Sequence, residues 1–290
     1  QQKLDAEDRK RAQQATEDAG LPIEAGNDAN IAEHLPMLLP DQQGDVAFFE
    51  RRLLTAKGHG VLTTNGTGTG KTFSGLGLVK RYARMGRDNI IIVVPNNKIA
   101  SDWAGSGKAL SLNIRQLSDT PDNGGSGVVL TTYANFRDNN SLLDREWDLL
   151  VFDESHYLRQ ADSFDTTQAE DMRNALTGHP RGRMAYHYKR HAEEYQQLRE
   201  MADSIKSKQG LRNLDDTTDQ MRDSLQKDID QLQKKSDRLR SKLQAAADRD
   251  VEQRAELWEQ NRADTLMLSA TPFPYRFSVD SAEGYLFDYE

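Results

Sequence analysis

Residues 61–72 read VLTTNGTGTGKT. The stretch combines a β-branched run, a turn in which every second residue is glycine, and Lys71 and Thr72 at the start of an expected helix. Glycines let the backbone curl so that successive N–H groups point inward, and the helix places the positive end of its dipole at the same spot. The pattern predicts a phosphate-binding loop. Its cradle would be Gly66, Thr67, Gly68, Thr69 and Gly70.

Two side chains at the end of this loop suit a nucleoside triphosphate. Lys71 can reach the β- and γ-phosphates, and the Thr72 hydroxyl can ligate Mg²⁺. The pattern G-x-x-x-x-G-K-[ST] requires a glycine where this chain has Asn65, so a glycine-rich turn that binds nothing is the alternative. A strand before the loop and a helix after it are the context that favours ATP and Mg²⁺.

A second apolar run ends in two adjacent carboxylates. Residues 147–156 read WDLLVFDESH, the expected form of a buried parallel strand with acids at its C-terminal end. Asp153 would hold Mg²⁺, directly or through water, and Glu154 would orient and deprotonate the attacking water. An ordinary helix cap is the alternative for this segment alone. Residues 265–272, TLMLSATP, form a third strand that ends in small hydroxyl residues, and the three segments together favour chemistry over capping.

These segments resemble motifs I, II and III of superfamily 2 helicases and translocases. DESH is similar to the DEAH or DExH box of that family, whose loop often lacks the first glycine. The resemblance covers about residues 36–156 and 263–290. It implies the first RecA-like lobe of a DEAD/DEAH-type or Snf2-like ATPase. It also implies that Ser269 and Thr271 couple the ATP site to nucleic acid by hydrogen bonding toward His156.

The end of the chain carries a narrower resemblance. The run LSATPF followed by SAEGYLFDY looks like phage and plasmid-borne proteins of the strawberry-notch and antirestriction methylase-helicase type. No arginine finger is evident in the sequence, and in the helicase family the fingers come from a second lobe. The chain begins at Gln1 and stops just after motif III, so we expect a piece of a longer polypeptide whose second RecA-like lobe is its partner.

Strands that alternate with helices predict an α/β fold with an open parallel sheet. The lobe would comprise residues 31–156 and 263–290, with every motif at the C-terminal end of a strand, which is the edge where such sheets bind ligands. A helix is expected over 73–85. Further strands are expected over 89–94, 113–117 and 127–132.

The segment LLPDQQGDV, within residues 31–54, resembles the upstream glutamine element that recognises adenine in the helicase family. Gln42 is the first candidate and Gln43 the second, and a surface helix start is the alternative for either. Asp41 is predicted to be the N-cap of this helix. Its core face would present Val46, Phe49 and Leu53 at helical spacing.

Two further strand ends resemble segments that contact nucleic acid in the family. VVPNNKIASDW resembles motif Ia, and the end of GVVLTT resembles the segment before motif II. The candidates are Asn96, Asn97 and Lys98 in the first and Thr131, Thr132 and Tyr133 in the second. A plain β-to-α turn with Asn caps explains the first set equally well, and capping and packing explain the second nearly as well.

Residues 157–262 form a helical insertion between motifs II and III. Two apolar seams with steps of three and four, separated by a break over 210–218, predict an antiparallel coiled-coil hairpin. The seams are Tyr188, His191, Tyr195, Leu198, Ala202 and Ile205, then Leu225, Ile229, Leu232, Ser236, Leu239, Leu243 and Ala246. A wedge, a grip or an arm that docks a protein partner is the functional interpretation. A family-specific spacer is favoured over it.

Histidines of this insertion raise the question of a metal site. His179, His187 and His191 lack neighbouring carboxylate or Cys residues at ligand spacing, so they are predicted to be seam and surface residues instead. Residues 1–30 are polar and charged, with acids matching bases, and are predicted to be a linker or a solvated helix rather than a nucleic-acid arm.

Composition bounds the remaining possibilities. The 290 residues carry a net charge of -8, which argues against coating DNA by bulk attraction but leaves room for a local basic groove. The sequence has no Cys, which excludes disulfides and fits a reducing compartment. No apolar run approaches the length of a membrane span, so a cytoplasmic location is expected, in a bacterium or in the host of a phage.

The combined expectation is an ATP-hydrolysing motor lobe of a DNA helicase or translocase. It would act on duplex DNA in a modification, restriction or antirestriction system. A nucleotide-gated binding or scaffold module whose helical arm recruits a partner is the alternative, and a P-loop ATPase that is not a helicase is the third reading. RNA is an open alternative substrate, because nothing in the sequence recognises a base or a 2′-hydroxyl.

Overall fold

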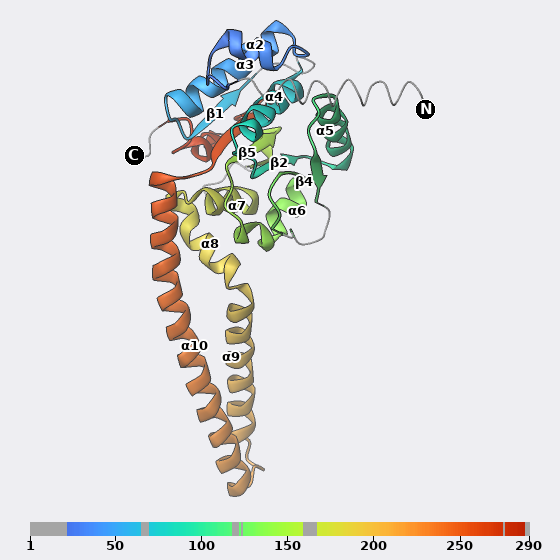
Figure 1. The fold of residues 1–290 in the computed structure, drawn as a ribbon. Coiled ribbons are helices and arrows are strands. Elements are labelled where there is room, and N and C mark those ends of the chain that lie inside the picture. Colours follow the sequence, from blue (N-terminus) through green and yellow to red (C-terminus); the bar gives the residue numbers. More distant parts are fainter. Residues whose placement is uncertain are drawn as a thin grey trace.

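The computed structural model describes residues 22–64, 70–117, 122, 124–158, 167–274 and 276–287. Within these ranges six parallel strands form one sheet in the order β1-β6-β5-β2-β4-β3 (Figure 1). The strands are β1 (Gly60–Thr63), β2 (Ile90–Val94), β3 (Ile114–Gln116), β4 (Val128–Thr132), β5 (Leu149–Asp153) and β6 (Asp264–Leu268). The predicted parallel α/β sheet is therefore confirmed.

The central strands are mainly apolar because helices cover both faces of the sheet, although β5 ends at Asp153 and β6 begins with Asp264 and Thr265. Every residue of β2, β5 and β6 is buried. Successive side chains alternate between the faces, so Ile90 and Ile92 join one hydrophobic core while Ile91 and Val93 join the other. Burial on both faces is what turns these strands into apolar runs in the sequence.

Helices of the N-terminal half pack on the first face. They are α2 (Asp28–His34), α3 (Pro40–Glu50), α4 (Lys71–Arg84) and α5 (Asn97–Ala109). The second face is covered by α6 (Tyr133–Asp138) and α7 (Gln168–Thr177). Each face thus has its own hydrophobic core, and the sheet separates the two.

The start of α3 differs from the prediction. The helix begins at Pro40 with Leu39 at the N-cap, and Asp41 lies in its first turn instead of capping it. Proline suits the first helical position because its missing N–H would have no partner there. The predicted core face is correct, since Val46, Phe49 and Leu53 are buried.

The N-terminal boundary expected at residue 30 falls inside a helix. Asn27 caps α2, which begins at Asp28, and Asn30 and Ile31 are already buried. Arg81 of α4 holds this region through hydrogen bonds to the side chain of Asn30 and to the backbone oxygen of Glu24. The described residues from 22 onward are therefore packed against the lobe.

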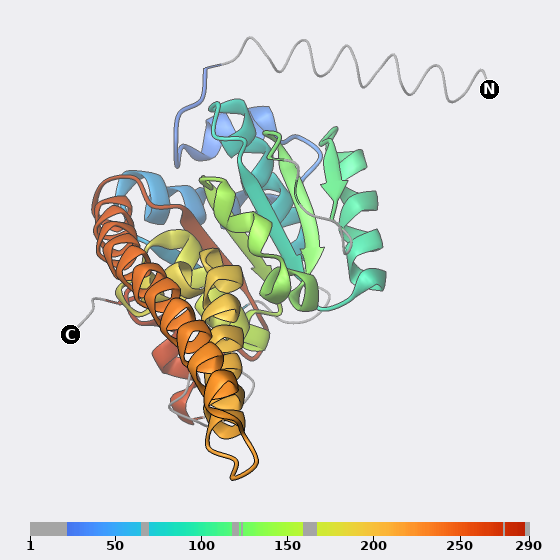
Figure 2. The same ribbon diagram turned by 90° about the horizontal axis from the view of Figure 1, so that it is seen from below.

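The insertion connects β5 to β6, which are neighbours in the sheet. After α7 come α8 (Arg183–Arg190), α9 (Ala192–Arg212) and α10 (Asp219–Gln260). Figure 1 shows α9 and α10 side by side and projecting from the lobe, and Figure 2 shows them from below, in front of it. At 42 residues, α10 is about 63 Å long.

Burial agrees closely with the predicted seam on α10 and less closely with the seam predicted before the turn. All seven predicted positions on α10 are buried or half-buried. Tyr188, the first position of the other predicted seam, lies on α8 and is exposed. On α9, Ala202 is exposed as well, and Met201 and Ser204 are half-buried in its place. No residue of α9 is fully buried, so the contact between the two helices is shallow. No described helix is long and apolar enough to cross a membrane.

Candidate nucleotide-binding site

Three neighbouring strands deliver the residues of motifs I, II and III to one edge of the sheet. In the order β1-β6-β5, the strand of motif III lies between the other two. Lys71 begins α4 after β1, Asp153 ends β5, and Ser269 follows β6 directly. The fold therefore gathers segments that are far apart in the sequence.

The phosphate-binding loop is described only at its end. Residues 65–69, which include the predicted Gly66, Thr67, Gly68 and Thr69, lie outside the described residues. Gly70 has a φ of 79°, a left-handed conformation that favours glycine. A Cβ atom at this position would also collide with the side-chain nitrogen of Gln42. The left-handed φ is the condition that favours glycine at position 70, because the amide of Gln42 is the end of a flexible side chain and could shift.

The two candidate glutamines have different surroundings. Gln42 is buried beside Gly70, and its Oε1 accepts a hydrogen bond of 3.0 Å from the backbone N–H of Leu39. Gln43 instead donates from Nε2 to the backbone oxygens of Leu35 and Leu38. Gln42 therefore lies next to the loop, whereas the amide of Gln43 holds the start of the helix.

Lys71 is a shielded cation without a hydrogen-bond partner among the described residues. Its side chain is 10% exposed, and its Nζ lies 4.0 Å from Oε1 of Glu154. A buried ammonium group that donates no hydrogen bond is costly unless a ligand satisfies it. Thr72 follows as the second residue of α4 and is half-buried. The orphaned ammonium group at the end of a glycine turn fits the phosphates of a nucleotide.

Asp153 is held in place by two donors. Its Oδ2 accepts from the indole N–H of Trp103 at 2.9 Å, and its Oδ1 accepts from the backbone N–H of Glu154 at 3.0 Å. Burial raises the pKa of Asp153, and the hydrogen bond from Trp103 opposes that shift. Trp103 is a core residue, and its role in orienting this carboxylate has no local signal in the sequence.

Glu154 has an unusual backbone. Its φ of 49° is left-handed, a conformation that costs a residue with a side chain about 1–3 kcal/mol. Its Oε2 lies 3.3 Å from Nδ1 of His156, and the same nitrogen lies 3.1 Å from Oγ of Ser269. The backbone N–H of Ser269 donates to the oxygen of Thr63 at the end of β1. A continuous set of contacts therefore joins Glu154 to the strands of motifs III and I.

Thr271 does not take part in the way expected. Its side chain is exposed, and no hydrogen bond joins it to His156 among the described residues. Its backbone N–H donates to Oγ of Ser269 at 3.2 Å. The residue thus supports Ser269 through its backbone, because the chain turns away from the sheet after β6.

Two of the nucleic-acid candidates after β4 are occupied inside the protein. Tyr133 is buried, and its hydroxyl donates to the backbone oxygen of Asp153 at 2.9 Å. Thr131 is buried as well, and its Oγ1 accepts from the side-chain amide of Asn135 at 2.7 Å. Burial also raises the pKa of Tyr133 well above its usual value. Packing, the alternative interpretation, accounts for both residues.

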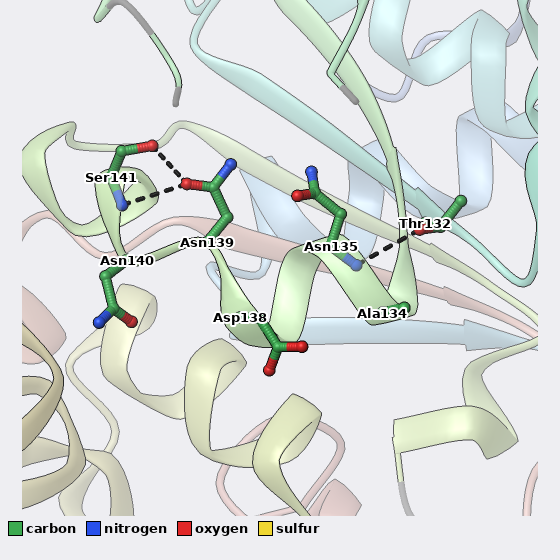
Figure 3. A pocket seen from close by; sticks show the side chains of 7 residues that line it. All are labelled: Thr132, Ala134, Asn135, Asp138, Asn139, Asn140 and Ser141. Atoms are coloured by element: carbon green, nitrogen blue, oxygen red, sulfur yellow. Dashed lines mark hydrogen bonds between the residues drawn. The ribbon is translucent and has the colours of Figure 1, made fainter. Parts of the chain in front are cut away.

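The remaining candidates lie at the adjacent ends of β2 and β4. Thr132 caps α6 by accepting the N–H of Asn135, and it lines a polar hollow of ≈ 470 Å³ (Figure 3). Asn96 caps α5 through the N–H of Ile99. Asn97 and Lys98 are exposed in the first turn of the same helix. These residues form a polar surface beside the motif residues.

A parallel sheet with a shielded P-loop lysine, a DE carboxylate pair and a motif III serine at adjacent strand ends defines a RecA-like lobe of helicase superfamily 2, an ATP-binding motor domain. Residues 36–181 match the family described as type III restriction enzyme, res subunit. Because the match spans half of the chain, the chain belongs to this family. A search of curated proteins finds no match.

Proposed function

We propose that this chain is the first motor lobe of a DNA helicase or translocase that hydrolyses ATP and acts together with a second RecA-like lobe. The observation that carries the proposal is the ammonium group of Lys71, which is shielded, donates no hydrogen bond to a described residue and lies 4.0 Å from the carboxylate of Glu154. The phosphate oxygens of ATP would accept the hydrogen bonds that this group lacks.

The roles of the site residues follow from their chemistry. Lys71 would bind the β- and γ-phosphates, and Thr72 and Asp153 would hold Mg²⁺, which would neutralise phosphate charge. Glu154 accepts a proton from water as the water oxygen bonds to the γ-phosphorus and the bond to the bridging oxygen breaks. The products are ADP, phosphate and a proton. Gln42 would contact adenine, which its position beside Gly70 supports.

Coupling to nucleic acid would run through His156 and Ser269. Nδ1 of His156 contacts both the carboxylate of Glu154 and Oγ of Ser269, so a shift of motif III would move the catalytic base. The surface formed by Asn97, Lys98 and Thr132 is the candidate track for a nucleic-acid backbone. The family description favours duplex DNA over RNA, and a phage, plasmid or restriction-modification origin is part of this proposal.

The test uses two chains, the 290-residue chain and a longer one that includes the following lobe. Lys71→Ala should abolish binding of a fluorescent ATP analogue by both chains. Glu154→Gln should retain binding and lower duplex-stimulated hydrolysis by the longer chain about 10²- to 10⁴-fold, because only the base is lost. Lys108→Ala is the matched control, since Lys108 is exposed at the far end of α5. Equal binding by Lys71→Ala and wild type would overturn the proposal.

A second candidate is a nucleotide-gated scaffold whose helical pair recruits a protein. The observation that favours it is a cluster of apolar side chains around the turn between α9 and α10. Leu211, Leu214 and Met221 are 53%, 50% and 59% exposed. If the longer chain binds ATP but its hydrolysis never responds to duplex DNA or RNA, this second function becomes the better account.

A further inference from the structure

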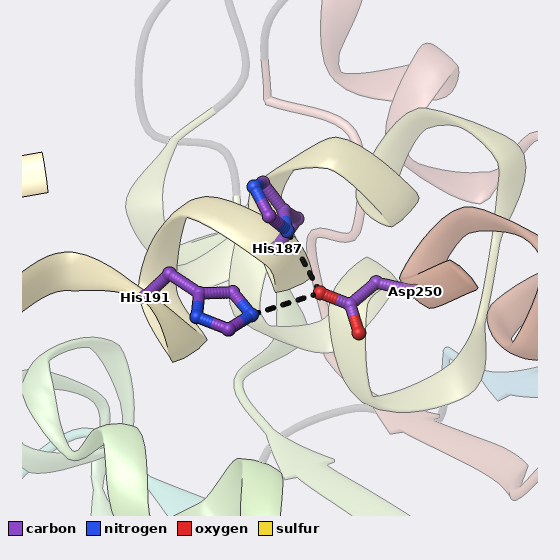
Figure 4. A group of neighbouring side chains, drawn as sticks. All are labelled: His187, His191 and Asp250. Carbon is purple, nitrogen blue, oxygen red and sulfur yellow. Dashed lines mark hydrogen bonds and ion pairs between the residues drawn. The ribbon is translucent and has the colours of Figure 1, made fainter. Parts of the chain in front are cut away.

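Three side chains from different segments converge at the base of the helical pair. His187 belongs to α8, His191 lies between α8 and α9, and Asp250 belongs to α10. His187 Nδ1 lies 2.7 Å from Oδ2 of Asp250, and His191 Nε2 lies 3.2 Å from the same oxygen (Figure 4). One ligand atom from each residue lies within 4.8 Å of the other two. His187 and Asp250 are buried, which corrects the expectation of seam and surface histidines without a carboxylate.

The outer nitrogen of each ring also faces an oxygen. His187 Nε2 lies 3.0 Å from the hydroxyl of Tyr195, and His191 Nδ1 lies 3.5 Å from Oε1 of Glu194. Histidines that bind metals typically donate their second ring N–H to such an oxygen, which fixes the tautomer. With protons on the outer nitrogens, both inner nitrogens present lone pairs toward Asp250.

Two nitrogen lone pairs and a carboxylate oxygen repel one another in a mostly buried site unless a positive species lies between them. Shared protons are one possibility, and a divalent metal ion is the other. Two imidazoles and a carboxylate are ligands that suit zinc and its neighbours in the first transition series. Ligands of a tetrahedral zinc site lie about 3.3 Å apart, so the 2.7 Å between His187 Nδ1 and Asp250 Oδ2 would widen by about half an ångström, while the 3.2 Å between His191 Nε2 and the same oxygen already suits the ion.

We propose that His187, His191 and Asp250 form a structural site for a divalent transition metal, with Zn²⁺ as the expected ion and water as the fourth ligand. The ion would fasten the corner between α8 and α9 to α10, and so set the direction in which the helical pair leaves the lobe. Glu194 and Tyr195 would hold the two rings from outside. The proposal is independent of the nucleotide site.

The test measures metal binding by the whole chain, prepared without a histidine tag. The chain is loaded with ZnCl₂, dialysed and analysed for zinc, and a Co²⁺ titration is followed by visible absorption, which reports tetrahedral nitrogen and oxygen ligands. His191→Gln and Asp250→Asn remove one ligand each. Asp248→Asn is the matched control, because Asp248 is exposed on the same helix. Circular dichroism checks that every variant keeps its helices.

The expected result is stoichiometric zinc in the wild type and in Asp248→Asn. Affinity should fall about a hundredfold or more in His191→Gln and Asp250→Asn, since even a partner that only orients a ligand is worth 10- to 100-fold. Zn²⁺ should raise the melting temperature of the wild type and not that of His191→Gln. Because the His191 side chain is only partly buried, this variant is expected to fold. Zinc binding that is absent in the wild type, or equal in wild type and both ligand variants, would show that shared protons hold the cluster.

Discussion

Two ion pairs of equal length contrast the lobe with the helical pair. Arg81 Nε lies 2.7 Å from Glu50 Oε1 in the lobe, and both side chains are fully buried. Lys208 Nζ lies 2.7 Å from Asp228 Oδ2 between α9 and α10, where the side chains are 29% and 50% exposed. Distance therefore does not distinguish them. Burial does, because water screens the second pair and is excluded from the first.

The same difference extends to the elements around each pair. Every residue of β5 is buried, whereas α9 has no buried residue. Arg81 also donates to Asn30 and to the backbone oxygen of Glu24, so several segments depend on one guanidinium group. The loss of a single contact is therefore expected to lower stability strongly in the lobe and only slightly between α9 and α10.

The largest effect should follow from breaking the buried pair. Glu50→Ala leaves the Arg81 charge buried without its partner, and the free energy of unfolding should fall by about 3–5 kcal/mol. Urea unfolding of the whole chain measures it. Glu33→Ala, at an exposed position of α2, is the control and should change little. A loss below about 1 kcal/mol in Glu50→Ala would contradict the contrast drawn from burial.

An intermediate effect on stability is expected from His179, where the helical pair meets the lobe. The His179 ring packs between Trp258 of α10 and Tyr285 of the lobe. Its Nε2 donates to the backbone oxygen of Glu283, and its Nδ1 accepts the N–H of Arg181, so a second ring proton would meet a donor. Burial, assisted by the charge of Arg173, lowers the pKa of His179 to about 3.

This pKa makes stability depend on pH in a defined direction. An unfolded histidine has a pKa of about 6.5, so between pH 6.5 and 3 the unfolded chain binds a proton that the folded chain does not. Stability should fall as pH falls, by about 2 kcal/mol between pH 6.5 and 5. The difference between wild type and His179→Gln, unfolded in urea at each pH, isolates the contribution. If the stability of wild type and of His179→Gln changed with pH in parallel, His179 would not be the source of the pH dependence.

The smallest effect should come from the exposed pair. Asp228→Ala should lower the free energy of unfolding by less than about 1 kcal/mol, and the loss should shrink further in high salt. Thermal unfolding followed by helical circular dichroism, at low and high ionic strength, measures this. A salt-independent loss of several kcal/mol would mean that the helical pair depends on its ion pairs as the lobe does.

Much of the sheet could be predicted because each strand is specified by its own short stretch of apolar residues. Strands buried on both faces consist mainly of apolar residues, so β2 and β5 stand out as apolar runs in the sequence. The motifs at the ends of parallel strands are predicted to share the C-terminal edge of the sheet, and Lys71 and Glu154 do approach each other there.

The features that were missed depend on contacts between distant segments. Tyr133 carries a hydroxyl that nucleic acid could use, and only the fold shows that it donates instead to the backbone oxygen of Asp153 at the end of β5. Ala202 fits a heptad by spacing, but the shallow contact with α10 leaves it exposed. Asp250 lies 63 residues beyond His187, and no local pattern could have joined them.

The length of α10 has a mechanical consequence. A sideways load applied at the turn beyond α9 acts on the lobe through a lever about 63 Å long. The helix ends at Gln260 and leads within a few residues into β6, which lies between β1 and β5, the strands that precede Lys71 and Glu154 in the chain. Torque from anything bound at the far end would therefore be delivered to the middle strand of the nucleotide site, next to Ser269.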